Sequence, residues 1–204
     1  MHISEGVLTA PVLLGGAALT TLGTALGLRA VDYDRLMRVA ILSAFFFVAS
    51  LVHVPVGPSS AHLVLNGLLG LFLGWAAFPA ILVGLTLQAV LFQYGGITTL
   101  GVNTFTMAAP AVLAHYVFRR FVTRPGGCRV AAFLCGGTAV LGAGVLVAVA
   151  LALSGDALLP VAQMILVAHL PVAGVEGVIA ALTVSFLLRA RPEMLAPLHR
   201  HGAL

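Results

Sequence analysis

The feature that most limits the fold of this chain is a succession of apolar stretches that approach 20 residues and carry almost no charge. Helices of that length match the hydrocarbon core of a bilayer. Of the 204 residues, 61% are hydrophobic and 8% are charged, whereas a soluble domain carries roughly a quarter charged residues. So few charges cannot cover a water-facing surface. The chain is therefore predicted to be a membrane protein that crosses the bilayer several times.

The apolar pattern predicts one all-α transmembrane domain over residues 1–204, with seven spans. The spans are expected at about 8–28, 37–55, 61–76, 78–95, 102–121, 130–154 and 172–189. The third and fourth are separated only by a turn near Ala76–Pro79, and we expect them to form a tight helical hairpin. The connection 155–171 is apolar enough to lie at the membrane interface or to enter the bundle, and the pattern leaves both open.

All ten basic residues are arginines, and with seven spans they fall on one side of the membrane. They occupy the first loop, the fifth loop region and the C-terminal tail: Arg29, Arg35, Arg38, Arg119, Arg120, Arg124, Arg129, Arg189, Arg191 and Arg200. The other side carries only Glu5 and Asp156 near its surface. The positive-inside rule places the arginine side in the cytoplasm. We therefore expect the N-terminus outside and the C-terminus inside, with no indication of nucleic-acid binding.

The N-terminal segment 1–7 opens with Met1-His2, which offers three nitrogen donors in sequence. These are the α-amine, the amide nitrogen of His2 once it loses its proton, and the His2 imidazole. Deprotonation of an amide requires a strongly Lewis-acidic ion, and four nitrogens in a plane suit Ni(II) or Cu(II) better than Zn(II). A second histidine would complete the plane, and His62 lies on the same predicted side. A Met-His start taken alone is more often incidental.

Polar residues near the predicted outer surface are expected to support such a site without touching the metal. Asn66 lies four residues after His62 and therefore on the same helical face. Two neighbouring spans add to the same cluster Gln88, Gln93, Asn103 and Thr104. Each of these side chains is also explained by a packing hydrogen bond. His53 and His169 lie on the correct side, but a lone interfacial histidine is usually a solvated cap, so both are left out of the ligand set.

The chain carries no motif for an energy source of its own. It contains no lysine and thus no GxxxxGK[ST] nucleotide loop, and no GxSxG or HExxH sequence indicates a hydrolase. The one acid deep in the apolar pattern is Glu176, which is expected to be structural, with a hydrogen bond near His53 or Gln88. Two alternatives stay open. One is a stand-alone divalent-cation carrier or channel with Glu176 as its coupling acid, and the other is a structural membrane protein without a metal function.

Four segments occur in order along the chain: MHISEG (1–6), VGPSSAHLVLNGL (56–68), QYGGITTLGVNTFTM (93–107) and HLPVAGVEG (169–177). Together they resemble the substrate-binding (S) membrane subunits of energy-coupling factor (ECF) transporters for nickel and cobalt, the NikM/CbiM group. The resemblance covers essentially the whole chain. It implies that Met1 and His2 provide the amine, amide and imidazole nitrogens, that His62 completes a square-planar site, and that Ser60 lies close to it.

The resemblance also implies a set of partners. These are a transmembrane coupling (T) subunit, cytoplasmic ATPase subunits and a small auxiliary membrane subunit, all in a prokaryotic plasma or inner membrane. Since ATP hydrolysis would take place on partner chains, the chain is expected to be no enzyme and to hold no cofactor of its own. The SSAHLVLNGL form looks like the nickel branch, so Ni(II) is the expected transported ion, ahead of Co(II).

Overall fold

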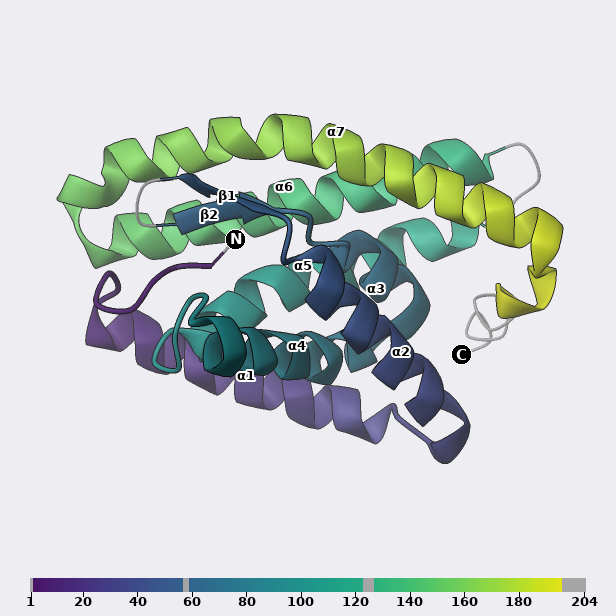
Figure 1. The fold of residues 1–204 in the computed structure, drawn as a ribbon, viewed down its shortest axis with the longest axis horizontal. Helices are drawn as coiled ribbons and strands as arrows, with labels where there is room; N and C mark the ends of the chain where they lie inside the picture. Colours follow the sequence, from purple (N-terminus) through teal and green to yellow (C-terminus); the bar gives the residue numbers. More distant parts are fainter. Residues whose placement is uncertain (1, 57–58, 123–126, 196–204) are drawn as a thin grey trace.

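The computed structural model describes residues 2–56, 59–122 and 127–195, and only the backbone of 33–34 and 53–62. The described residues form a helical bundle with one small hairpin (Figure 1). Its α-helices are α1 (Ala10–Arg29), α2 (Tyr33–Ala49), α3 (Asn66–Leu73), α4 (Ala77–Phe92), α5 (Leu100–Val122), α6 (Cys128–Ser154) and α7 (Leu159–Ala190). Short 3-10 turns follow three of them: η1 (Gly74–Ala76), η2 (Asp156–Leu158) and η3 (Pro192–Met194).

Each predicted span overlaps one of these helices, in order, and the helical membrane fold is confirmed in that coarse sense. Four helical stretches of the described chain are long and apolar enough to cross a bilayer: Ala10–Arg29, Asn66–Phe92, Cys128–Ser154 and Asp156–Ala190. Helix α2 has only 17 residues, and α5 carries polar residues at its start and two arginines in its last turn. Seven crossings therefore remain a prediction.

A two-stranded antiparallel hairpin replaces the predicted end of the second span, the connection after it and the predicted start of the third span. Strand β1 (His53–Val56) pairs with β2 (Ser59–His62), and His53 lies opposite His62 in the register. The second span was predicted to end at 55 and the third to start at 61. Both boundaries are thus wrong, and the fold is not purely α. Hydropathy does not distinguish an apolar strand from an apolar helix, whereas the valines around Pro55 favour extended backbone.

The reversal expected between the third and fourth spans lies at η1, slightly before the predicted turn. Asn66 at the start of α3 contacts Met107 of α5, and Leu71 near its end contacts His115 of α5, so α3 runs beside α5 toward the arginine-bearing end. Gly74 then adopts a φ of 55°, a conformation that glycine reaches without strain. Helix α4 returns along α1 and α2.

Helix α7 is longer than predicted, because most of the connection 155–171 is helical. It starts at Leu159 instead of 172 and continues for 32 residues through Pro171. Figure 1 shows it beside α6 along the upper side of the bundle. The connection therefore belongs to the bundle, which is one of the two placements that the apolar pattern left open.

Glycines let the helices approach closely. A Cβ added at Gly70 would lie 2.1 Å from the carbonyl oxygen of Ala111, and one at Gly67 would lie 2.6 Å from the Cα of Gly136. Close backbone contact of this kind is the usual basis of helix association in membranes. It fixes α3 between α5 and α6.

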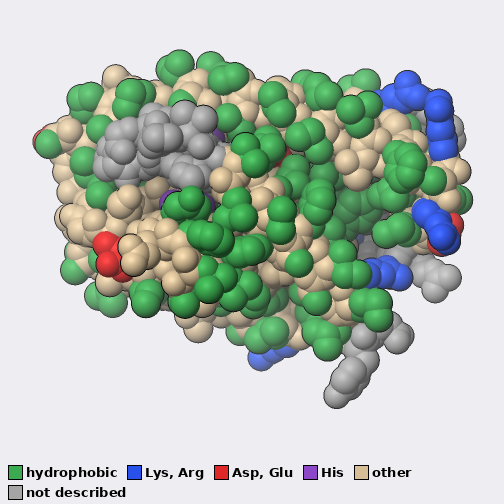
Figure 2. Space-filling view, in the orientation of Figure 1, with side chains coloured by type: hydrophobic (Ala, Val, Ile, Leu, Met, Phe, Trp, Pro, Cys, Tyr) green, Lys and Arg blue, Asp and Glu red, His purple; other side chains and the backbone are tan. Residues whose placement is uncertain are grey.

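The described arginines gather at one end of the bundle. They lie in the last turns of α1, α5 and α7 and near the starts of α2 and α6. In Figure 2 most of the basic surface lies on the right, where α7 ends in Figure 1. The N-terminal segment enters at the opposite end, against the start of α5.

Candidate functional site

The N-terminal segment is folded into the bundle. His2 is only 5% exposed and Ile3 is fully buried. Asn103 of α5 holds this backbone at two points: its Oδ1 accepts from the Ile3 N–H at 2.9 Å, and its Nδ2 donates to the Ile3 carbonyl at 3.1 Å. An amide side chain bonded in this way forms the pair of backbone hydrogen bonds that a neighbouring strand would otherwise provide. The backbone beside His2 is thus fixed in position.

Gln88 of α4 fixes the orientation of the His2 ring. Its Nε2 donates to the carbonyl of Phe47 at 3.3 Å and to the Ser50 hydroxyl, which orients the amide so that Oε1 faces His2. The Gln88 Oε1 lies 2.6 Å from the His2 Nε2. Because Oε1 can only accept, Nε2 carries the proton and the lone pair of the neutral ring resides on Nδ1. Nδ1 is the ring nitrogen that closes a small chelate ring with the amide nitrogen of the same residue.

The loop before α5 closes over the same place. Gly95 has a φ of 78°, and a Cβ there would lie 2.9 Å from the Asn103 Nδ2 and 3.3 Å from the His2 Cδ2. Gly96 has a φ of 149° and packs on Glu5, whose Oε1 accepts from the Thr98 N–H at 3.1 Å. Gly95 and Gly96 therefore allow the loop to touch the N-terminal segment.

The residues predicted to support the site divide into two groups. Asn103 is at the site, and Gln88, rather than Gln93, is the glutamine that contacts His2. Gln93 is an exposed C-cap of α4 with a φ of 57°. Thr104 is fully buried, next to Asn103 on α5. A glutamine inside an otherwise apolar helix was the signal for Gln88, since burial of a polar group requires a partner.

Asn66 supports the fold at a different place. It is fully buried, and its Nδ2 donates to the carbonyls of Met107 at 3.0 Å and Ala139 at 3.3 Å. The side chain thus joins the start of α3 to α5 and α6. Its predicted position on a helical face shared with His62 is wrong, because β2 ends at His62 and α3 begins only at Asn66.

The remaining predicted ligands are not fully described. Met1 lies outside the described residues, and the side chains of Ser60 and His62 do as well. The backbone of both belongs to β2. Among the described residues no group of three or more His, Cys, Asp and Glu side chains gathers in one place. A site built mainly from backbone nitrogens and two histidines would not produce such a group.

Glu176 has a structural contact close to β2. Its carboxylate is 1% exposed, and it accepts from the backbone N–H groups of Val64 and Leu65, the latter at 2.8 and 2.9 Å. Leu65 has a φ of 51° and directly precedes α3. The carboxylate therefore holds the junction between β2 and α3. The predicted contact near Gln88 is wrong, because Gln88 contacts His2, Phe47 and Ser50, and the side chain of His53 lies outside the described part of the chain.

His169 differs from the solvated cap that its position suggested. It is 2% exposed, its ring packs on Gly144 of α6, and its Nδ1 lies 2.6 Å from the Ile165 carbonyl. The extension of α7 toward the N-terminus explains the difference, since His169 lies inside a helix and not at its end.

The chain matches known metal transporters over almost its full length. Residues 2–194 match the family model described as the cobalt uptake substrate-specific transmembrane region. A protein of Haemophilus influenzae described as a candidate metal transport protein is 44% identical over 199 residues, which are 96% of this chain and 97% of the relative. The cobalt transport protein CbiM of Kyrpidia tusciae is 34% identical over 96% of this chain and 86% of its own length.

Nickel appears among the relatives as well. The fused nickel transport protein NikMN of Rhodobacter capsulatus is 32% identical over 97% of this chain and 64% of its own length. A crystal structure of a transition metal transporter superposes with a TM-score of 0.82 at 28% identity, over 100% of this chain and 98% of that one. This chain belongs to the CbiM family of substrate-specific transmembrane components for cobalt and nickel uptake.

Proposed function

We propose that this chain captures Ni(II) at its N-terminus, through the Met1 amine, the His2 amide nitrogen, the His2 Nδ1 and His62. The observation that carries the proposal is the contact between the His2 Nε2 and the Gln88 Oε1. It selects the ring tautomer that chelation through the backbone requires. Such a hydrogen bond on the nitrogen opposite the metal is the usual support of a ligating histidine.

The ordered backbone around His2 also supports the proposal. Asn103 fixes the backbone of Ile3, and the Gly95 backbone packs on His2 from the other side. Because the backbone is already ordered, metal binding would lose little conformational entropy. The hydrogen bonds from the Val64 and Leu65 N–H groups to Glu176 of α7 would likewise steady the segment that follows His62.

Nickel is favoured over cobalt by the donor set. A deprotonated amide and three further nitrogens in a plane suit Ni(II), and selectivity against Cu(II) would come from cavity shape and metal supply. Binding consumes the proton-free forms of the amine, the amide and the imidazole, so the affinity should fall steeply as the pH is lowered.

We infer that the arginine-bearing end faces the cytoplasm and that the metal site faces outward. Uptake would then depend on partner chains, namely a coupling subunit and ATPases, with a small auxiliary membrane subunit. The carrier alternative has less support, because the Glu176 carboxylate already accepts two backbone N–H groups. A coupling acid must be able to release these partners when it takes up a proton.

Metal titration of the purified chain with an authentic Met1 tests the proposal. Ni(II) and Co(II) are titrated calorimetrically into the unmodified chain, a His62→Ala variant and a chain with one residue added before Met1. We expect tight Ni(II) binding with a square-planar absorption spectrum, and its loss in both variants. His115→Ala serves as the matched histidine control, because His115 lies at the opposite end on α5 and should leave the affinity unchanged.

The contrary results are equally clear. Native affinity in the extended chain would disprove the role of the amine. Tighter binding of Co(II) than of Ni(II) would leave the site but reverse the metal. Metal transport by the purified chain in liposomes without ATPases would favour a stand-alone carrier.

A further inference from the structure

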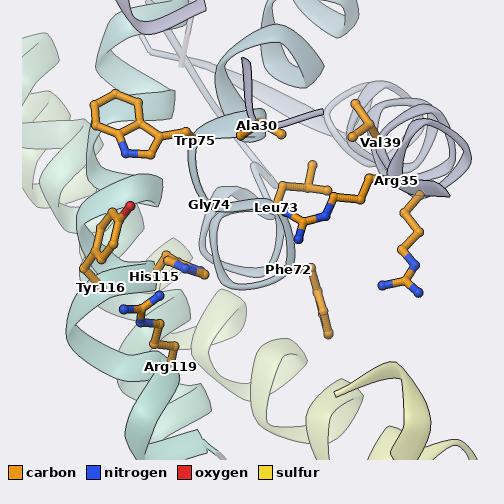
Figure 3. Close-up of a pocket in the computed structure, with 12 residues that line it drawn as sticks. Ala30, Arg35, Val39, Phe72, Leu73, Gly74, Trp75, His115, Tyr116 and Arg119 are labelled. Atoms are coloured by element: carbon orange, nitrogen blue, oxygen red, sulfur yellow. The ribbon is translucent and has the colours of Figure 1, made fainter. Parts of the chain in front are cut away.

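A cleft lies at the arginine-bearing end of the bundle, far from His2. This arginine cleft has a volume of about 130 Å³ and lies between α2, the turn η1 and α5. Three guanidinium groups line it, from Arg35, Arg38 and Arg119. Figure 3 shows Arg119, Tyr116 and His115 of α5 on one side, with Leu73 and Gly74 in the centre and α2 opposite. None of the roles proposed above uses this cleft.

The charge of the cleft suits a phosphate group. No acidic side chain is among the described residues that line it. The Asp32 carboxylate lies 3.5 Å from the Arg35 Nε at the start of α2. Both side chains of this pair are exposed, and such pairs contribute little. The Arg119 guanidinium lies 5.0 Å from the Tyr116 ring centroid, which restrains it. Guanidinium groups bind phosphate oxygens in a bidentate manner.

An apolar groove continues from the cleft along the bundle. It has a volume of about 190 Å³, runs between α2, α3 and α7, and shares Arg38, Phe72 and Leu73 with the arginine cleft. Its other walls include Leu42 and Leu187. A cationic cavity that lies beside an apolar one, with three lining residues in common, matches a molecule with an anionic head and a hydrocarbon tail.

The position of both cavities agrees with such a molecule. The helix ends that carry the arginines mark one boundary of the apolar bundle, and Trp75 and Tyr116 line the cleft at that level. Aromatic residues concentrate where a bilayer meets water, and basic pockets between transmembrane helices hold anionic head groups. We propose that the arginine cleft and the groove together bind one anionic phospholipid, with its phosphate at the arginines and an acyl chain along Leu42 and Leu187.

The proposal is tested by lipid binding to the full chain in a neutral detergent. Native mass spectrometry measures the occupancy with phosphatidylglycerol and with phosphatidylcholine. We expect a clear preference for phosphatidylglycerol, and a fall in its affinity by roughly 30-fold in the double variant Arg38→Gln, Arg119→Gln, since each cation near a head group contributes about one kcal/mol. The double variant Arg129→Gln, Arg189→Gln is the control, because it removes two arginines at the same end that line neither cavity.

Two further experiments distinguish the binding of a lipid from the binding of a free anion. Thr183→Trp fills the groove from α7 and should weaken phosphatidylglycerol binding about tenfold while the chain keeps its folded helix content by circular dichroism. Inorganic phosphate at millimolar concentration should not displace the lipid. Equal binding of the two lipids, or an equal fall in the control variant, would overturn the proposal. Displacement by inorganic phosphate together with unchanged binding in Thr183→Trp would show a free-anion site instead.

Discussion

At the scale of single residues, two amides shape the N-terminal segment. Asn103 fixes its backbone and Gln88 fixes the His2 ring, and each comes from a different helix. The sequence placed Asn103 near the site. It did not separate Gln88 from Gln93, because both are polar residues in or beside one apolar helix and only burial distinguishes them.

Replacement of Gln88 by Leu should weaken Ni(II) binding by about 10- to 100-fold, the usual effect of removing the partner of a ligating histidine. The ring would lose the acceptor for Nε2–H and with it the preference for the required tautomer. Calorimetry of the purified variant measures the change. Gln93→Leu, at an exposed position of the same helix end, is the control, and an equal loss in both variants would contradict the assigned contact.

At the scale of the elements, α3 is held by close backbone contacts and by one carboxylate. Gly70 packs on α5, and Glu176 of α7 holds the residues that precede α3. Both contacts connect segments more than 40 positions apart. Neither contact could be predicted from the local sequence.

Gly70→Ala should lower the free energy of unfolding by about 3 kcal/mol, because its Cβ would lie 2.1 Å from a backbone oxygen. Motion of a side chain cannot relieve this steric overlap. Thermal unfolding in detergent measures the effect. Gly15→Ala on α1 is the matched control, since nothing lies within 4 Å of a Cβ there and alanine favours a helix over glycine. A stable Gly70→Ala variant would mean that α3 and α5 do not pack as described.

Glu176→Gln tests the structural role of the buried acid. The amide keeps one acceptor but loses the charge, so the unfolding free energy should fall by roughly 1.5–3 kcal/mol, the value of hydrogen bonds to charged groups. Metal uptake by cells that express all the subunits should keep its dependence on external pH. A variant of unchanged stability whose uptake no longer responds to pH would favour the coupling-acid alternative.

At the scale of the whole molecule, the charge distribution predicts one orientation in the membrane. Cysteines introduced at Asp156 and Glu193 mark the two ends, in a background of Cys128→Ser and Cys135→Ala. Asp156 and Glu193 are both exposed. A membrane-impermeant maleimide applied to intact cells should label the cysteine at 156 and not that at 193. The opposite pattern would reverse the inferred sidedness and contradict an outward metal site.

The sequence alone determined that the chain lies in a membrane, that it is mainly helical and in which order its helices follow. These properties depend on the local hydropathy of the chain, which the composition and the length of the apolar runs report. It also indicated the chelating start and the family. The tertiary structure decided the hairpin of β1 and β2, the length of α7, the contact of Gln88 rather than Gln93 with His2, and the partners of Glu176. These features depend on which polar groups are buried together. A polar group buried in an apolar bundle is costly without a partner, and the partners of Gln88, Asn103 and Glu176 lie far away in the chain.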